Sequence, residues 1–132
     1  MKRLVWFSLV VIIGIFPAQA RVWYVAPDGT GDGSSWESPL GSLVSALTAS
    51  TNGDDIWVKE GTYNEAITMK EGVALYGGFP TAGSPEWADR DWEANGTIID
   101  ASGLKTSVVV GANNATLDGF TVTGASASSS PA

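Results

Sequence analysis

The spacing of apolar residues changes character near Asp54. On its amino-terminal side, residues 21–27 alternate like a short β-strand, and a loop rich in Gly, Asp and Ser follows. On its carboxyl-terminal side, short alternating stretches recur, separated by Gly and Asn. These stretches are DIWVKEG, AITMKEG, VALYGGF, GTIIDASG, TSVVVGANN and ATLDGFTVTGA. We therefore expect a chain made mainly of short strands, with one helix ahead of most of them.

The helix is predicted between the first strand and the repeated stretches. Four apolar residues recur at the i, i+3, i+4, i+7 spacing that places them on one helix face. They are Leu40, Leu43, Val44 and Leu47. Ser38 suits the N-cap, Pro39 suits the first helical position, and Gly53 suits the turn that ends the helix. We expect a helix from Pro39 to Ser50 with its apolar face buried.

One apolar anchor can be aligned in each strand region of the second part. The anchors are Val58, Leu75, Ile99 and Leu117, at intervals of 17, 24 and 18 residues. A repeat of about 18 residues with two or three short strands is typical of a β-solenoid, whose coils bury their apolar faces only by stacking. We expect these four side chains to form one ladder within about three coils. A β-sandwich of short strands is the alternative.

The same alignment places secondary apolar anchors and two acids above one another. Ile67 and Met69 align with Val108 and Val110 at common offsets. Asp100 aligns with Asp118, and outward-facing carboxylates one coil apart would lie about 5 Å from each other. Such a pair would suit calcium or a retaining glycosidase. The alternative is that both are turn-forming Asp residues at strand ends, and we favour it.

Composition narrows the classes of function. The 132 residues include 14 acidic and 7 basic side chains, with no His and no Cys. The absence of His removes the commonest general base and metal ligand, and the absence of Cys removes disulfides. A net charge of −7 opposes binding to nucleic acid or to anionic membrane surfaces, since both require Lys and Arg.

The first 20 residues have the layout of a secretory signal peptide. Lys2 and Arg3 begin it, 13 residues from Leu4 to Phe16 form an apolar stretch, and Ala18-Gln19-Ala20 supplies a small-x-small cleavage pattern. The stretch is shorter than the roughly 20 residues that span a bilayer. A short membrane anchor is the alternative. Cleavage would leave five basic residues against 14 acidic ones, and we expect a secreted or cell-surface protein whose mature chain has no membrane span.

Several stretches resemble the opening of secreted bacterial right-handed parallel β-helix proteins of the pectate-lyase-like superfold. They are GDDIWVKEGTYNE, GVALYGGF, RDWEANGTIID and NATLDGFTVTG. They are similar to surface proteins related to polymorphic outer-membrane proteins and to the domain of unknown function called DUF1565. The resemblance runs from about Val22 to Gly124 and implies an all-β, right-handed parallel β-helix rather than a specific activity. It also implies that the helix caps the open end of the first coil, which exposed strand edges require.

The expected organisation has four parts. They are a signal peptide at 1–20, a strand, Gly/Asp loop and capping helix at 21–53, β-helix coils at 54–125, and a Ser/Ala-rich tail at 126–132. Ser126 and Ser128 stand where the coil that begins at Leu117 should place its next apolar pair. We therefore expect a truncated version of a longer β-helix protein whose uncapped lower edge self-associates. The alternative is a natural small domain whose edge is covered by a partner copy.

The interval between Leu75 and Ile99 contains a loop, PTAGSPEWADRDWEAN, that is about six residues longer than its neighbours require. Its Trp87, Arg90 and Trp92 are candidate glycan-binding residues, because aromatic faces stack on sugar rings and neighbouring acids accept hydroxyl hydrogens. The alternative, which we favour, is a loop folded back on the coil, with Trp92 buried and Arg90 paired to an acid of its own loop, Asp91 or Glu93.

The Gly-rich stretch DGTGDGSSWE has weak EF-hand character. Asp28, Thr30 and Asp32 alternate as calcium ligands do, but the acid required at loop position 12 is replaced by Pro39. A turn between the first strand and the helix explains the stretch better. We expect no cofactor, and calcium is only weakly supported.

Two functions of different classes remain. The first is non-catalytic: the N-terminal part of an extracellular or cell-surface β-helix protein that acts in adhesion or glycan binding, with a polysaccharide or cell surface as partner. The second is the N-terminal fragment of a polysaccharide lyase, hydrolase or epimerase whose catalytic coils lie beyond Ala132. No position matches a lyase motif, so we name no catalytic residue and favour the first.

Overall fold

The computed structural model describes residues 20–126. Most of the predicted signal peptide and most of the predicted tail lie outside this range. Short strands dominate the described residues, with one α-helix and one 3-10 turn. The elements are β1 Val22–Val25, α1 Leu43–Ala49, β2 Asp55–Lys59, β3 Gly61–Tyr63, β4 Ile67–Thr68, β5 Ala74–Phe79, η1 Trp87–Asp89, β6 Thr97–Asp100, β7 Val109–Val110, β8 Thr116–Asp118 and β9 Thr121–Thr123. No helix within residues 20–126 is long and apolar enough to cross a membrane.

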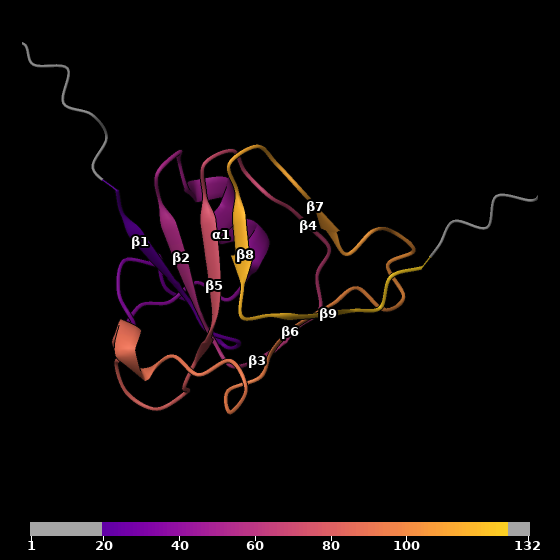
Figure 1. Cartoon of the computed structure of the whole chain (residues 1–132). Helices are drawn as coiled ribbons and strands as arrows, with labels where there is room; N and C mark the ends of the chain where they lie inside the picture. Colours follow the sequence, from indigo (N-terminus) through magenta and orange to yellow (C-terminus); the bar gives the residue numbers. More distant parts are fainter. Residues whose placement is uncertain (1–19, 127–132) are drawn as a thin grey trace, which may run out of the picture.

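The strands form three sheets that the chain visits in turn. The orders are β1-β2-β5-β8, β3-β6-β9 and β4-β7, and every strand pair is parallel. Figure 1 shows these sheets as three sides around a common interior. The fold is therefore all-β, built from parallel sheets with little helix, and the alternative of a β-sandwich is wrong.

Each sheet contributes one row of side chains to the interior. Ile56 pairs with Leu75 and Leu75 with Leu117 in the first sheet, while Tyr63 pairs with Ile99 in the second. All but Leu117 are fully or nearly fully buried. Burying one such aliphatic side chain stabilises the fold by about 2 kcal/mol, so these rows hold the sheets together.

The single ladder predicted from Val58, Leu75, Ile99 and Leu117 is wrong in two respects. Ile99 lies in the second sheet, and Val58 lies beside Val25, two positions along from the row that contains Leu75. The first error follows from unequal circuits, because Ile56 and Leu75 are 19 positions apart but Leu75 and Leu117 are 42 apart. Within residues 20–126 the chain therefore makes two complete circuits plus β8 and β9, close to the predicted number of about three coils.

The second error is a shift of two residues, because Leu75 pairs with Ile56 rather than with Val58. Such a shift keeps the same face of the strand inward, so alternation did not reveal it. Val58 instead lies opposite a bulge in β5: Trp57 pairs with Tyr76 and Lys59 with Phe79, so Gly77 and Gly78 together oppose one residue of β2. Gly78 has φ of 92°, a left-handed conformation that favours glycine.

The secondary alignments also need correction. Ile67 pairs with Val109, one residue from the predicted Val108. Asp100 pairs with Thr123 and Asp118 with Tyr76, so the two acids belong to different sheets and form no carboxylate pair.

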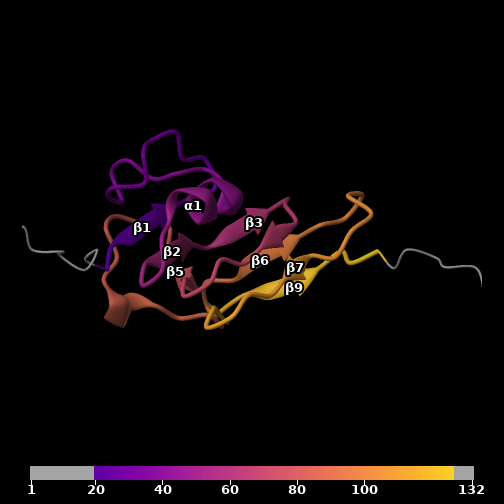
Figure 2. The same ribbon diagram turned by 90° about the horizontal axis from the view of Figure 1, so that it is seen from above.

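Helix α1 begins later than predicted. Its N-cap is Ser42, because Leu40 is used in an isolated bridge to Val25. Leu43 and Leu47 are buried as predicted, whereas Val44 is 44% exposed, contrary to the prediction. The helix packs on β1 and β4 and lies at one end of the stacked strands, here called the upper end (Figure 2).

The opposite, lower end is formed by β7, β8 and β9, the last strand of each sheet. Val122 is exposed and Leu117 is only partly buried there. Self-association through this edge stays a prediction.

Candidate ligand-binding surface

An aromatic row lies on the outer face of the first sheet. Tyr24, Trp57 and Tyr76 occupy paired positions on β1, β2 and β5, and Asp118 of β8 continues the row. They alternate with the inward-facing Ile56 and its partners because successive side chains of a strand point to opposite faces. The Tyr24 and Trp57 rings are 5.9 Å apart between centroids.

Two loops and the last residue of β5 bring further aromatic rings onto this row. Phe79 stacks on Trp57 with centroids 4.9 Å apart, Trp36 contacts Tyr24 at 4.7 Å, and Trp87 contacts Tyr76 edge-on at 4.8 Å. The Nε1 of Trp36 donates to the carbonyl oxygen of Pro85 over 2.8 Å. This hydrogen bond joins the Gly-rich loop, residues 28–37, to residues 80–96. These aromatic side chains therefore form a small second hydrophobic core on the outer face of the first sheet.

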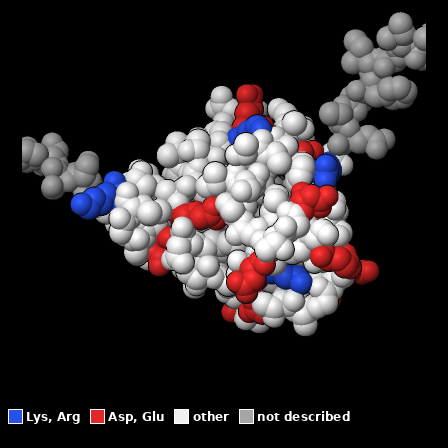
Figure 3. All heavy atoms as spheres, turned by 180° about the vertical axis from the view of Figure 1, so that it is seen from behind, with Lys and Arg blue, Asp and Glu red and all other residues white. Residues whose placement is uncertain are grey.

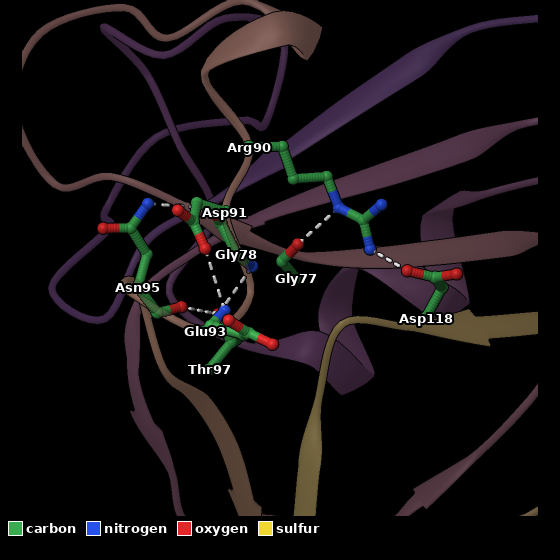
Figure 4. Close-up of polar contacts among 8 residues, drawn as sticks. All are labelled: Gly77, Gly78, Arg90, Asp91, Glu93, Asn95, Thr97 and Asp118. Atoms are coloured by element: carbon green, nitrogen blue, oxygen red, sulfur yellow. Dashed lines mark hydrogen bonds and ion pairs between the residues drawn. The ribbon is translucent and has the colours of Figure 1, made fainter.

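Residues 90–97 are anchored on the glycine bulge of β5 (Figure 4). Arg90 Nε donates to the Gly77 carbonyl over 2.6 Å, and the Asp91 amide donates to the Gly78 carbonyl over 2.8 Å. Asn95 Nδ2 reaches the same Gly78 carbonyl at 3.1 Å, and Thr97 Oγ1 accepts from the Gly78 amide. These hydrogen bonds hold the RDWEAN stretch against β5, so the loop folds back on the coil.

Trp92 is nevertheless held out toward solvent. The Asp91 carboxylate accepts from the amides of Glu93 and Ala94, each over 3.0 Å, which turns the chain sharply around Trp92. The Trp92 side chain is 59% exposed, so its predicted burial is wrong. It borders a groove of about 480 Å³ whose other walls are residues 117–121.

Arg90 pairs with Asp118 of the last circuit, rather than with Asp91 or Glu93 (Figure 4). Its guanidinium carbon also lies 5.2 Å from the ring centroids of both Tyr76 and Trp87. The structure therefore connects Trp87, Arg90, Asp118 and Trp92, and we call these four residues the loop strip. Trp87 lies over the sheet and Trp92 beside the groove, with the ion pair between them.

The acids of the Gly-rich loop serve turns and contacts between loops. Asp32 accepts from the amide and hydroxyl of Ser34 over 3.0 and 2.5 Å, and these hydrogen bonds lower the pKa of Asp32. Glu37 accepts from Ser84 Oγ over 2.8 Å. Residues 20–126 contain no group of three or more acidic side chains placed to hold a metal ion.

Sequence reasoning missed Lys59, which is only 7% exposed although it is charged. Its Nζ donates to the carbonyls of Thr81 and Gly83 over 2.9 and 2.8 Å. Burial lowers the pKa of Lys59, against a smaller opposite effect of the Glu37 carboxylate. The alternation of Trp57 with Ile56 and Val58 could have placed Lys59 on the outer face, but not beneath a loop.

Charged side chains are scattered over the face shown in Figure 3. Acidic and basic atoms lie there in small groups separated by uncharged surface, with more acidic than basic groups. That face lacks the broad basic patch that a nucleic acid would require.

The chain was compared with known proteins in three ways. A family model described as "Protein of unknown function (DUF1565)" matches residues 25–130. Neither the curated proteins nor the solved structures gave a match.

Proposed function

The chain belongs to the DUF1565 family, and on this premise we propose that it is an exported, right-handed parallel β-helix domain that binds glycans without catalysis. Strand order supports the fold, because consecutive strands pass through the three sheets in a fixed cycle and pair only in parallel. Right-handed crossovers between parallel strands of one sheet are almost universal. The layout of residues 1–20 supports export.

The observation that carries the glycan proposal is the exposed Trp92 on an anchored loop. An exposed aromatic ring on a mobile segment is weak evidence of binding, but the backbone that carries Trp92 is fixed by the hydrogen bonds of Asp91, beside a groove. A fixed aromatic face binds with little loss of conformational entropy.

The rest of the groove supplies the polar contacts that a sugar ring needs. Asp118 presents carboxylate oxygens that accept hydroxyl hydrogens, and Arg90 fixes the orientation of that carboxylate. Arg90 is therefore a positioning residue, while Trp92 and Asp118 contact the ligand. Trp87 extends the loop strip for a longer chain of sugar units.

Binding of the purified chain to a panel of soluble and arrayed polysaccharides tests this proposal. Trp92→Ala is expected to weaken binding at least about tenfold, as the loss of a central aromatic anchor does in other interfaces. Trp92→Phe keeps a ring and should retain part of the affinity. Leu104→Ala, which removes another exposed apolar side chain from a different loop, is the matched control and should bind normally.

Three outcomes would count against the proposal. They are an absence of glycan binding, equal binding by the chain and its Trp92→Ala variant, and cleavage of the bound polysaccharide that increases with protein concentration. The last would contradict only the non-catalytic part.

A further inference from the structure

A polar cavity of about 650 Å³ opens at the carboxyl ends of β1 and β2. Its walls are residues 26–31 and 37–39, together with Lys59 and Thr81. It shares no residue with the groove beside Trp92. The sequence pattern gave no indication of it, because Lys59 and Thr81 are at least 20 residues from the other wall residues and from each other.

The walls are already held in place without a ligand. Gly31 donates its amide to the Pro39 carbonyl over 2.8 Å, and Gly33 donates to the Ser38 carbonyl over 2.7 Å. A Cβ at Gly29 or Gly31 would overlap the backbone of the facing segment, so this close approach requires glycine. A cavity with fixed walls binds without the entropic cost of ordering loops.

Lys59 provides a buried positive charge at one wall. An ammonium group has three N–H donors, and two of them reach the carbonyls of Thr81 and Gly83. The third is available to an oxygen atom of a ligand. Lys59 Nζ also lies 5.0 Å from the centroid of the Trp36 ring, but within residues 20–126 no carboxylate forms an ion pair with it. A lysine buried without an ion-pair partner is costly for folding, which favours a role in binding.

The charges around the cavity select the class of ligand. Asp28 and Glu37 outnumber Lys59, so the net charge of −1 disfavours an anion, while the Lys59 ammonium disfavours a cation. A neutral ligand with several hydroxyl groups can hydrogen-bond all three charged side chains, since it donates to the two carboxylates and accepts from Lys59. Thr30, Ser38 and Thr81 add hydroxyls, and Pro27 and Pro39 add apolar surface against C–H groups.

We propose that this cavity binds one neutral saccharide unit, as a second site separate from the loop strip. The choice of a saccharide among neutral polyols rests on the proposed glycan function, whereas the site itself does not. A glycan chain bound in the Trp92 groove would then make a second contact with the protein at the cavity, which would raise the effective affinity for long glycans.

Titration of the ¹⁵N-labelled chain with methyl glycosides of neutral hexoses tests the proposal. Saturable amide shifts are expected at residues 28–31, 59 and 81. Lys59→Met should weaken this binding about tenfold or more, as the loss of a charged hydrogen-bond donor does. Since Lys59 is buried, the exposed variants Asp28→Ala and Thr30→Val provide a second test that leaves the fold intact, and each should weaken binding by a smaller factor.

Comparison ligands separate the outcomes. A methyl uronate or glycerol that binds as tightly as the neutral hexosides would overturn the saccharide assignment, and an absence of shifts in these residues would overturn the site. Trp92→Ala should leave the methyl glycoside shifts unchanged while it weakens polysaccharide binding at least about tenfold, the remaining binding being due to the cavity. If Trp92→Ala binds polysaccharide as tightly as the parent chain and the cavity shifts also remain, the proposed function fails and the cavity stands.

Discussion

At the scale of single residues, Asp54 is the most heavily hydrogen-bonded acid of the described chain. Its carboxylate accepts from the Arg21 amide, from Trp23 Nε1 and from the Thr51 amide, at 3.0, 3.0 and 2.9 Å. Burial alone would raise the pKa of Asp54, but these hydrogen bonds outweigh it and the pKa is lowered. The carboxylate therefore joins β1 to the turn that precedes β2.

We expect Asp54→Asn to destabilise the fold by about 1–3 kcal/mol at neutral pH, because the amide replaces one acceptor oxygen with a donor. The lowered pKa means that the ionised carboxylate stabilises the fold above the pKa of an unfolded Asp, about 4. This contribution is lost as the pH falls from there through the lower, folded value. Urea unfolding between neutral pH and about pH 3 should therefore show a weaker acid dependence in the variant than in the parent chain.

The neighbouring Asp55 is the matched control. Burial, and to a lesser extent repulsion by Asp54, raises the pKa of Asp55, so its charge opposes folding at neutral pH. Asp55→Asn should leave the free energy of unfolding unchanged or slightly increase it. An equal decrease in the free energy of unfolding of Asp54→Asn and Asp55→Asn would contradict this prediction.

At the scale of elements, helix α1 depends on the strands beneath it. Seven residues are too few for a stable isolated helix. Glu65, which precedes β4, accepts from the Leu43 amide over 2.8 Å and from the Ser42 hydroxyl at the helix N-terminus. Lys70, which follows β4, donates to the carbonyls of Thr48 and Ser50 at the C-terminus. Both charges complement the helix dipole.

Removing either contact should loosen α1. We expect Glu65→Gln and Lys70→Met each to lower the free energy of unfolding by about 0.5–2 kcal/mol, the usual range for lost helix caps. Amide hydrogen exchange in residues 43–49 should accelerate in both variants. Glu71→Gln, an exposed change next to Lys70, is the control, and an identical effect in it would show that overall charge rather than capping is responsible.

At the scale of the whole molecule, strand pairing is most complete in the middle of the stack. Within residues 20–126, β2 and β5 have neighbours on both sides, whereas the first and last strands of each sheet have one, and helix α1 packs on the upper ones. Amides of β2 and β5 should therefore exchange with solvent hydrogen most slowly, and those of β9 much faster. A uniform exchange rate from β2 to β9 would show instead that the lower end is covered in solution.

The sequence predicted the fold class more accurately than the pairing of residues between neighbouring strands. Alternation located seven of the nine strands, but β3 was missed and β9 was merged with β8, because only one or two residues separate each of them from the strand before it. The ladder failed at Leu75, which pairs with Ile56 rather than Val58, because a shift of two residues leaves the alternation unchanged. It failed again at residues 80–96, which connect β5 to β6 while Glu60 alone connects β2 to β3.

The candidate site was predicted in part. The loop with Trp87, Arg90 and Trp92 was identified from composition, but the partner of Arg90 lies 28 residues away, on a strand that only the folded stack brings close. Lys59 was missed for the same reason, since its partners Thr81 and Gly83 belong to the next circuit. Contacts between circuits have no fixed spacing when the circuits differ in length.

Within residues 20–126 the upper end of the stack is covered and the strands of the lower end lack a partner below them, which gives the stack a direction of growth. A strand added above β3 or β4 would have to displace α1 and the segment that carries Pro27, whereas one added below β8 would only extend an existing hydrogen-bonding pattern. Lengthening of this domain, by evolution or by protein engineering, is therefore expected at the β9 side. Every longer version would therefore keep the cavity beside Lys59 and helix α1, which covers the upper end, unchanged.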